Sequence, residues 1–574
     1  MKRKVAIGIQ DFSKIKERNA FYIDKTEFIR EWWESGDDVT LITRPRRFGK
    51  TLTMSMVEQF FSINVQNTEE LFQDTAIKQA EEVWKLKGSY PVISLTFSDV
   101  KETDGEKAKR RIAGLIAEIY NRFAYLTEKE IMTPAEKDYF WNIASQKDPE
   151  EIVVSLRRLS EFLYRYYGKK VLILLDEYDT PLQEAYVDDY WDELTLFIRG
   201  LFNASFKSNP YLEKAILTGI TRVSKESVFS DLNNLKVITT TSNEYADSFG
   251  FTEKEVFAAL DEYGKSDKKA VVKEWYDGFT FGDCVDIYNP WSIINYLDTG
   301  KLGAYWANTS SNSLIDKLVR SGNVSVKEDF ETLLQGKNLV KQIDEQIVYD
   351  QLYTKEDAIW SLLLASGYLK IEKTEFDERT GKLDYYLRLT NKEVRIMFLR
   401  MIRDWFANYD CGYNEFIQAL LSNDLEAMNV YMNRVALNTF SFFDSGKRPS
   451  AESEPERFYH GFVLGLLVEL EDRYYISSNR ESGFGRYDVI LEPRDKNENA
   501  YIIEFKVYDP EKEKTLEDSV KNALAQIEEK KYATELIKRG IRAENIRRYG
   551  FAFCGKKVLI GIEKGKDYNQ HVIR

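Results

Sequence analysis

The sequence predicts an α/β protein that begins with a parallel sheet and ends with a second, smaller α/β domain. In the first part of the chain, segments typical of buried strands alternate with segments typical of helices. Strands are expected at 38–45, 90–100, 170–182 and 214–223, and a helix at 50–62 follows the first strand directly. This alternation is typical of a parallel sheet with helices on both faces.

The pattern changes after residue 250 to helices and aromatic-rich loops. Over about 340–405 the expected order is helix, strand, Gly-containing turn, strand and helix, which predicts a winged helix. A polar stretch at 443–456 is the expected linker. It is followed by a helix, three strands, a long helix and one final strand. The predicted domains are therefore 1–250, 251–445 and 446–574.

The composition narrows the chemistry that the 574 residues can perform. Two histidines and three widely spaced cysteines exclude a His-rich metal centre and give no disulfide framework, so a metal must be held by oxygen. The N-terminus lacks the apolar run of a signal peptide, and no apolar run approaches the roughly 20 residues that span a bilayer. We expect a cytoplasmic protein without a membrane partner. Because the net charge is −13, nucleic acid would need a local basic patch.

Residues 43–51, TRPRRFGKT, end in the way a phosphate-binding loop ends, between an expected strand and an expected helix. Gly49 would let backbone N–H groups turn toward phosphate. Lys50 would reach the β- and γ-phosphates, and the Thr51 hydroxyl would bind Mg²⁺. The usual motif has glycine where this chain has Arg44. A surface turn before a helix is therefore the alternative for the short tripeptide alone.

A second motif favours the nucleotide site. The aliphatic run VLILL leads directly into Asp176 and Glu177, at the carboxyl end of a predicted buried strand. Ligands bind at that end of a parallel sheet. Asp176 would hold the water shell of Mg²⁺, and Glu177 would polarise an attacking water. The two motifs in this order predict a site for ATP and Mg²⁺.

Several stretches resemble one known family, the AAA-ATPase-like proteins fused to a PD-(D/E)XK nuclease domain. The similarity covers most of the chain and rests on FYIDKTEFI, RPRRFGKTL, LLDEYDTPL, LTGITRVSKESVFSDLNNL and the C-terminal GRYDVILEP and YIIEFKV. It implies a P-loop ATPase sheet followed by a restriction-endonuclease-like domain. It also implies that arginine in the first loop position, Arg44, is the family's own variant.

The resemblance implies roles for further residues around the nucleotide. Arg46 and Arg47 would add positive charge near the phosphates, or would form a solvated basic turn. Thr218 would sense the γ-phosphate, and Arg222 would contact it within the chain or from a neighbouring copy. A homo-oligomer is therefore an open alternative, as are simple packing for Thr218 and a salt bridge for Arg222.

The C-terminal domain carries a second candidate site. Glu504 and Lys506 share one face of a predicted strand because successive side chains alternate, and Asp488 lies one hairpin away. Asp488 and Glu504 would hold Mg²⁺, and Lys506 would orient a water or neutralise developing charge. A solvated hairpin face is the alternative, although charges inside an aliphatic strand are costly unless used.

The resemblance implies three more residues at this site and a combined function. Gln526 and Tyr532 match residues on the helix after the catalytic strands, and Glu456 matches a third metal-site acid. We expect an ATP-binding and ATP-hydrolysing protein whose Mg²⁺-dependent nuclease acts on nucleic acid, with DNA expected, under nucleotide control. One alternative is a nucleotide-dependent switch whose C-terminal domain binds nucleic acid or protein without cutting. Another is an ATPase that assembles partners and keeps the nuclease fold as a scaffold.

Overall fold

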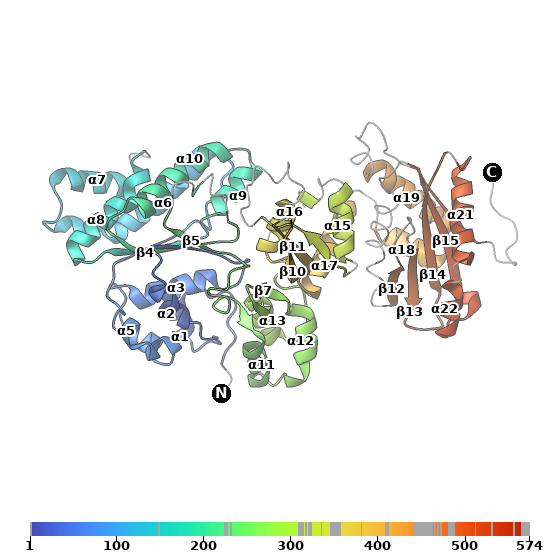
Figure 1. The fold of residues 1–574 in the computed structure, drawn as a ribbon, viewed down its shortest axis with the longest axis horizontal. Helices are drawn as coiled ribbons and strands as arrows, with labels where there is room; N and C mark the ends of the chain where they lie inside the picture. The colour runs from blue at the N-terminus through green and yellow to red at the C-terminus, as the bar shows by residue number, and fades with distance from the viewer. Residues whose placement is uncertain are drawn as a thin grey trace. The chain divides into compact units, whose positions relative to one another are not determined.

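The chain folds as two compact units in a computed structural model (Figure 1). Unit 1 comprises Met1–Leu318 and Asn338–Val394, and unit 2 comprises Val319–Lys337 and Arg395–Arg574. The structure describes residues 3–146, 150–222, 228–229, 232–307, 315, 318–319, 324–334, 336–344, 358–379, 381–407, 413–439, 463, 467, 470, 473–479, 488–510, 512–529, 532–554 and 557–563.

A five-stranded parallel sheet forms the centre of the N-terminal part of unit 1, which confirms the predicted fold class. Its strand order is β2-β3-β4-β1-β5, and all four pairings are parallel. Helices cover both faces, with α2 and α3 on one side and α6, α8 and α10 on the other (Figure 1). The strands are β1 (Val39–Thr43), β2 (Val92–Thr96), β3 (Val171–Asp176), β4 (Leu212–Gly219) and β5 (Leu235–Ile238). The main helices are α1 (Phe12–Glu17), α2 (Glu27–Glu34), α3 (Lys50–Phe61), α6 (Gly105–Arg122), α7 (Pro134–Ala144), α8 (Ser155–Tyr167), α9 (Thr180–Val187) and α10 (Trp191–Phe202).

The central strands are buried along their whole length, which explains their continuous aliphatic sequences. Every residue of β1 and β3 is buried. The edge strand β5 was missing from the sequence prediction. It has four residues, LKVI, of which only Ile238 is buried, so it lacks the long apolar run that marks β3.

The rest of unit 1 follows the parallel sheet in the chain. Two three-stranded sheets have the orders β6-β8-β7 and β10-β11-β9. The expected order of helix, strand, strand and helix is present as α16, β10, β11 and α17, while its assignment as a winged helix stays a prediction. The elements are β6 (Phe251–Thr252), α11 (Glu253–Glu262), α12 (Lys269–Tyr276), β7 (Phe279–Phe281), β8 (Cys284–Tyr288), α13 (Pro290–Thr299), β9 (Leu339–Lys341), α16 (Ala358–Ala365), β10 (Leu369–Asp377), β11 (Lys382–Leu389) and the start of α17 (Lys392–Ala407), which belongs to unit 2 from Arg395 on.

Unit 2 is built on a mixed five-stranded sheet of order β12-β13-β14-β15-β16. Only the β14–β15 pair is parallel. The expected single final strand is in fact an antiparallel pair, β15 and β16, whose register pairs Cys554 with Lys557. The elements are α15 (Val324–Leu334), α18 (Tyr413–Ser422), α19 (Leu425–Thr439), β12 (Tyr474–Asn479), β13 (Asp488–Pro493), β14 (Ala500–Val507), α21 (Leu516–Glu529), α22 (Tyr532–Lys538), β15 (Ile546–Cys554) and β16 (Lys557–Ile562).

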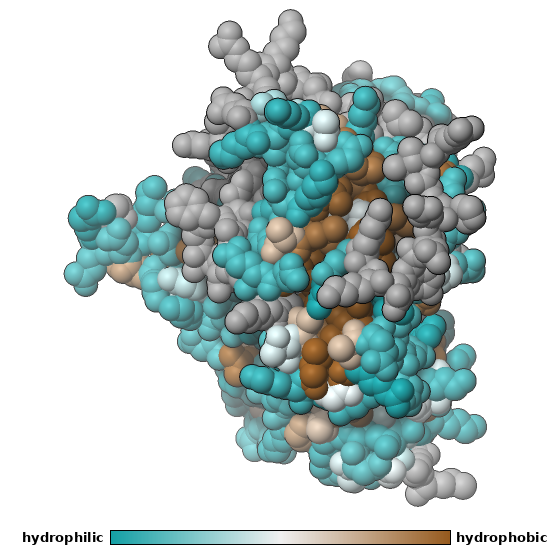
Figure 2. Space-filling view, turned by 90° about the vertical axis from the view of Figure 1, so that its right-hand side faces the viewer, coloured by the Kyte–Doolittle hydropathy of each residue, from teal (hydrophilic) through white to brown (hydrophobic). Residues whose placement is uncertain are grey.

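Two helix pairs enclose this sheet. Phe416 of α18 and Met432 of α19 belong to the same hydrophobic cluster as Tyr501 and Phe551 of the sheet, so residues before 446 contribute to this core. Helices α21 and α22 pack on the other face, in a second cluster that contains Ile502. Figure 2 shows the side of unit 2 that carries α21 and α22, with hydrophobic residues in the middle and hydrophilic residues around them.

Two glycines let α21 lie directly on the sheet. An added Cβ at Gly550 would come within 2.9 Å of the Val520 carbonyl oxygen, and one at Gly561 within 2.4 Å of Val520 Cγ1. Glu504 pairs with Gly550, and Gly550 pairs with Gly561. Paired residues point to the same face, so Glu504 and both glycines form one row beneath α21.

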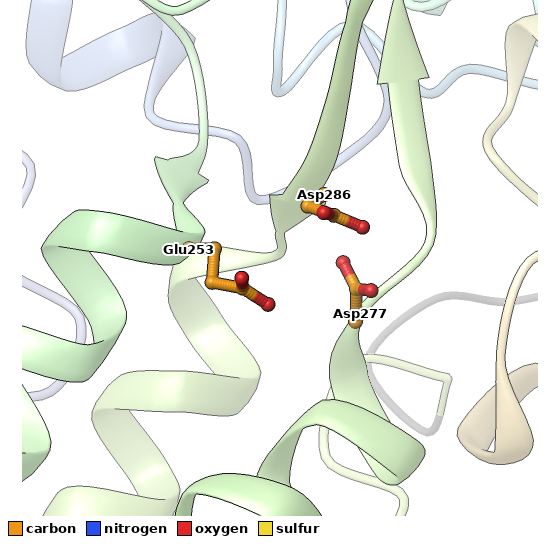
Figure 3. A group of neighbouring side chains, drawn as sticks. All are labelled: Glu253, Asp277 and Asp286. Atoms are coloured by element: carbon orange, nitrogen blue, oxygen red, sulfur yellow. The ribbon is translucent and has the colours of Figure 1, made fainter.

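Three acids from different elements of unit 1 form a cluster: Glu253 begins α11, Asp277 follows α12, and Asp286 lies on β8. Figure 3 shows the carboxylates of Glu253, Asp277 and Asp286 directed toward one another, and their oxygens lie within 4.8 Å. Lys273 contacts all three: it donates a hydrogen bond to Glu253, and its Nζ lies 3.3 Å from Asp286 and 3.7 Å from Asp277. Burial and the neighbouring Asp286 raise the pKa of Asp277 to about 7.

This raised pKa predicts a pH-dependent stability of unit 1. Between about pH 4 and pH 7, Asp277 keeps its proton in the native state. In the unfolded chain, where its pKa is about 4, it has lost that proton. The stabilisation is therefore present below about pH 4 and is lost as the pH rises through about 7. Asp277→Asn should be more stable than wild type by about 1–3 kcal/mol at about pH 8 and should differ little at about pH 4. Urea unfolding at both pH values measures this, with the exposed Asp298→Asn as control. An equal effect of Asp277→Asn at both pH values would contradict the assignment.

Candidate nucleotide and nuclease sites

The loop between β1 and α3 has the backbone of a tight phosphate-binding turn. Gly49 has φ 87° and precedes the first residue of α3, a left-handed conformation that glycine adopts without strain. Arg47 also has a positive φ of 64°. The loop is joined to the end of β4, because Arg44 N donates to Gly219 O at 3.1 Å. These constraints place the N-terminal end of α3 at the carboxyl edge of the sheet.

Lys50 lies across this loop. Its side chain is buried, and its Nζ donates to the carbonyl oxygens of Arg44 at 2.8 Å and Pro45 at 2.9 Å. Burial lowers the pKa of Lys50, and the nearby carboxylates of Glu177 and Asp176 act in the opposite direction. The ammonium is thus held inside the loop by neutral carbonyl acceptors, which an anion could replace.

Asp176 connects three elements of the sheet edge. One of its oxygens accepts a hydrogen bond from the Thr51 hydroxyl at 2.6 Å, and the other accepts one from the Thr218 hydroxyl. The structure therefore brings together Thr51, Asp176 and Thr218, which the sequence placed on three separate segments. A hydroxyl beside a carboxylate is a donor set that suits Mg²⁺.

Glu177 follows Asp176 in a left-handed conformation, with φ 52°. Its N–H donates to the Thr218 hydroxyl at 3.4 Å. Burial, and then the charge of Asp176, raise the pKa of Glu177. A carboxylate whose pKa is raised toward neutrality is suited to accept a proton from water.

Asp179 is a site residue that the sequence interpretation missed. It is buried, and its Oδ2 accepts from Ile220 N, Thr221 N and the Thr221 hydroxyl, each at 2.9 Å. It thereby holds the segment that follows β4. Arg222 comes next in this segment and is half-buried. Its contact with a nucleotide stays a prediction. The signal for Asp179 was its place within the run DEYD, close behind Asp176.

Arg44 does not point its guanidinium into the loop. The group is fully buried and donates to the carbonyl oxygens of Thr43 at 3.0 Å, Thr239 at 2.5 Å and Glu244 at 3.4 Å. It also lies 4.5 Å from the centre of the Phe281 ring, and burial lowers the pKa of Arg44 to about 9. These contacts hold the Arg44 side chain beneath the loop, and a role for Arg44 in binding the nucleotide stays a prediction.

Arg46 and Arg47 are exposed on the loop. Arg46 Nη2 donates to Gln183 Oε1 of α9 at 3.4 Å. The Arg47 guanidinium lies 4.4 Å from the centre of the Trp291 ring. Both side chains thus have partners outside the loop, and their contact with phosphate stays a prediction.

In unit 2, the sheet register brings the predicted nuclease residues together. Asp488 of β13 pairs directly with Glu504 of β14, so the two residues lie on the same face. The Nζ of Lys506 is 3.9 Å from a Glu504 oxygen. The hairpin spacing and the i, i+2 relation on β14 therefore produce the arrangement that the sequence predicts.

Glu504 has unusual surroundings for an acid. It is completely buried, and within the described part of the chain neither carboxylate oxygen accepts a hydrogen bond. A buried carboxylate without such bonds destabilises the folded state by roughly several kcal/mol. The cost falls if a cation binds there, so the oxygens of Glu504 fit a hard divalent metal such as Mg²⁺.

The additional residues implied by the resemblance are only partly described. Gln526 of α21 is buried, and its Nε2 has no hydrogen-bond partner among the described residues. Tyr532 is the first residue of α22, but its side chain lies outside the described part. Glu456 lies outside the described residues altogether. The roles of all three stay predictions.

Comparison with known proteins agrees with this geometry. Residues 6–229 match a family described as a predicted AAA-ATPase, and residues 454–563 match the PD-(D/E)XK nuclease superfamily. An uncharacterized protein in the vnfD 5' region of Azotobacter chroococcum mcd 1 is 25% identical over 565 residues, which cover 94% of this chain and 95% of that protein. Within the described residues, no helix has the length and apolar character needed to cross a membrane. The chain therefore joins a predicted AAA-ATPase domain to a PD-(D/E)XK nuclease superfamily domain, the fusion that its sequence resembles.

Proposed function

We propose that the protein binds and hydrolyses ATP in unit 1 and cuts nucleic acid, with DNA as the expected substrate, in unit 2. Both reactions would use Mg²⁺. The observation that supports the proposed nuclease is the burial of Glu504 directly opposite Asp488, where neither of its oxygens accepts a hydrogen bond from the residues that the structure describes. A scaffold or a pure binding domain has no need for such a group, which favours cleavage over the two alternatives.

In the nucleotide site, Lys50 would leave the carbonyl oxygens of Arg44 and Pro45 for the β- and γ-phosphates. Thr51 and Asp176 would hold Mg²⁺, which would neutralise charge that develops on the phosphates. Glu177 would accept a proton from the attacking water, in keeping with its raised pKa.

In the nuclease site, Asp488 and Glu504 would hold Mg²⁺, which lowers the pKa of a bound water and stabilises the charged phosphate. Lys506 would orient that water or neutralise charge near the scissile phosphate. We further propose that nucleotide binding in unit 1 regulates the nuclease, that the protein works in the cytoplasm, and that Arg222 acts within the chain or between copies in a homo-oligomer.

The nucleotide site is tested by Lys50→Ala. Loss of the ammonium should abolish measurable ATP binding, because Lys50 supplies the charge that faces the phosphates. Isothermal titration calorimetry with ATP and Mg²⁺ measures it. Lys236→Ala is the control, since the Lys236 side chain on the edge strand β5 is partly exposed, and it should bind ATP normally. Equal affinity of wild type and Lys50→Ala would refute the site.

The role of Glu177 is tested by Glu177→Gln, which keeps the shape of the side chain but removes the base. ATP binding should persist while hydrolysis falls by about 10²-fold or more. Phosphate release and ATP affinity are measured together, with Glu184→Gln on α9 as control. Unaltered turnover in Glu177→Gln would assign the base to another group.

The nuclease centre is tested by three alanine variants. Asp488→Ala and Glu504→Ala should abolish cleavage and weaken Mg²⁺ binding, whereas Lys506→Ala should abolish cleavage and keep Mg²⁺ binding. Mg²⁺ should also raise the melting temperature of unit 2 in wild type but not in Glu504→Ala, since the ion offsets a buried charge. Plasmid, single-stranded DNA and RNA serve as substrates, and Glu498→Ala is the control. Cleavage that continues in chelator, or in Lys506→Ala, would return unit 2 to the binding alternative.

A further inference from the structure

The carbonyl oxygen of Arg46, in the middle of the phosphate loop, is held by two side chains that lie far away in the sequence. Trp306 Nε1 donates to it at 3.0 Å and Asn289 Nδ2 at 3.3 Å. Both donors come from the region after residue 250, and neither belongs to the nucleotide motifs.

This contact fixes the direction of one peptide group of the loop. In a trans peptide the carbonyl of one residue and the N–H of the next point in opposite directions. Holding the Arg46 carbonyl on the side of Trp306 and Asn289 therefore turns the Arg47 N–H to the other side. A phosphate-binding loop works through inward backbone N–H groups, so this orientation bears on anion binding.

The same peptide precedes a strained residue. Arg47 has φ 64°, which costs a residue with a side chain roughly 1 kcal/mol or more relative to its preferred conformations. Glycine would adopt this conformation freely, but the chain has arginine here. The conformation persists only because surrounding groups hold it, and the two donors on Arg46 O are such groups.

Both donors are in turn arranged by one buried acid, Glu393, in the first turn of α17. One of its oxygens accepts from Trp306 N at 2.6 Å, and the other accepts from the Ser292 hydroxyl at 2.8 Å. Asn289 is tied to the same helix as Ser292, because its Oδ1 accepts from Trp291 N and Ser292 N at the start of α13. Glu393 is fully buried.

We propose that Glu393 is a positioning residue for nucleotide binding, which acts through Trp306 and Asn289 on the Arg46–Arg47 peptide. The contacts that join the start of α13, Trp306 and the first turn of α17 would then set the affinity of the loop for the phosphates of ATP. Because ATP binding is itself proposed, Lys50→Ala is measured in parallel.

The decisive variant is Trp306→Phe, which removes the Nε1 donor and keeps an aromatic ring. Loss of one of the two hydrogen bonds to Arg46 O should weaken ATP binding about tenfold. Trp32→Phe is the matched control, because Trp32 is also buried and its Nε1 has no acceptor among the described residues. The affinity of the Trp32→Phe variant for ATP should stay within about twofold of wild type.

The acid is tested by a pair of variants. Glu393→Ala removes the acceptor of Trp306 N and should weaken ATP binding about tenfold or more, whereas Glu393→Gln keeps one acceptor oxygen and should restore most of the affinity. Calorimetric titration with ATP and Mg²⁺ is carried out below the melting temperature of each variant. If Glu393→Ala does not fold, the ATP affinities of Trp306→Phe and Glu393→Gln test the positioning role instead.

The outcomes separate this inference from the proposed function. Wild-type affinity in Trp306→Phe, together with loss of binding in Lys50→Ala, would overturn the positioning role and leave the nucleotide site intact. Equal losses in Glu393→Gln and Glu393→Ala would overturn the role of Glu393 as an acceptor. Absence of ATP binding in wild type would instead refute the nucleotide site itself.

Discussion

The hydrogen bonds that Asp176 accepts from Thr51 and Thr218 determine how the edge of the parallel sheet is assembled. A buried carboxylate is costly unless its oxygens accept hydrogen bonds, and here the two donors come from α3 and β4. The start of α3 is thereby fixed against the ends of β3 and β4. This arrangement helps to position Lys50 and Glu177, which lie beside Thr51 and Asp176 in the sequence.

Asp176 and Glu504 show two solutions to the same physical problem. Both are buried acids at strand positions, but the protein satisfies the oxygens of Asp176 with its own hydroxyl groups. The oxygens of Glu504 receive no such bonds in the described part of the chain. The first arrangement is satisfied by the protein alone, whereas the second would be stabilised by a bound cation. This difference supports the proposal that Asp176 organises the fold and that Glu504 binds a metal ion.

Much of the fold and of the two candidate sites could be predicted from the sequence, because local patterns carry the information for them. Aliphatic runs gave the buried strands, and the i, i+2 rule with a hairpin gave the row of Asp488 and Glu504. The short edge strand β5 and the break between β15 and β16 were missed because their signals are weak. The direction of the Arg44 guanidinium could not be predicted, since its acceptors lie about 200 residues away along the chain. The same holds for Trp306 and Glu393, whose role depends on tertiary packing alone.

The division of the chain into two units limits how its C-terminal domain can be exchanged between proteins by recombination. The backbone passes between the two units at three places, at 318, 337 and 394, rather than at one linker. Helices α18 and α19, which precede residue 446, complete the hydrophobic core beneath β14 and β15. A gene segment that begins at residue 446 would keep Val463, Leu467 and Leu470 of this cluster but would lose its contacts with α18 and α19, so one apolar face of the sheet would be only partly covered. Recombination that exchanges this nuclease-superfamily domain between proteins would be expected to carry the preceding helices with it, because they complete its core.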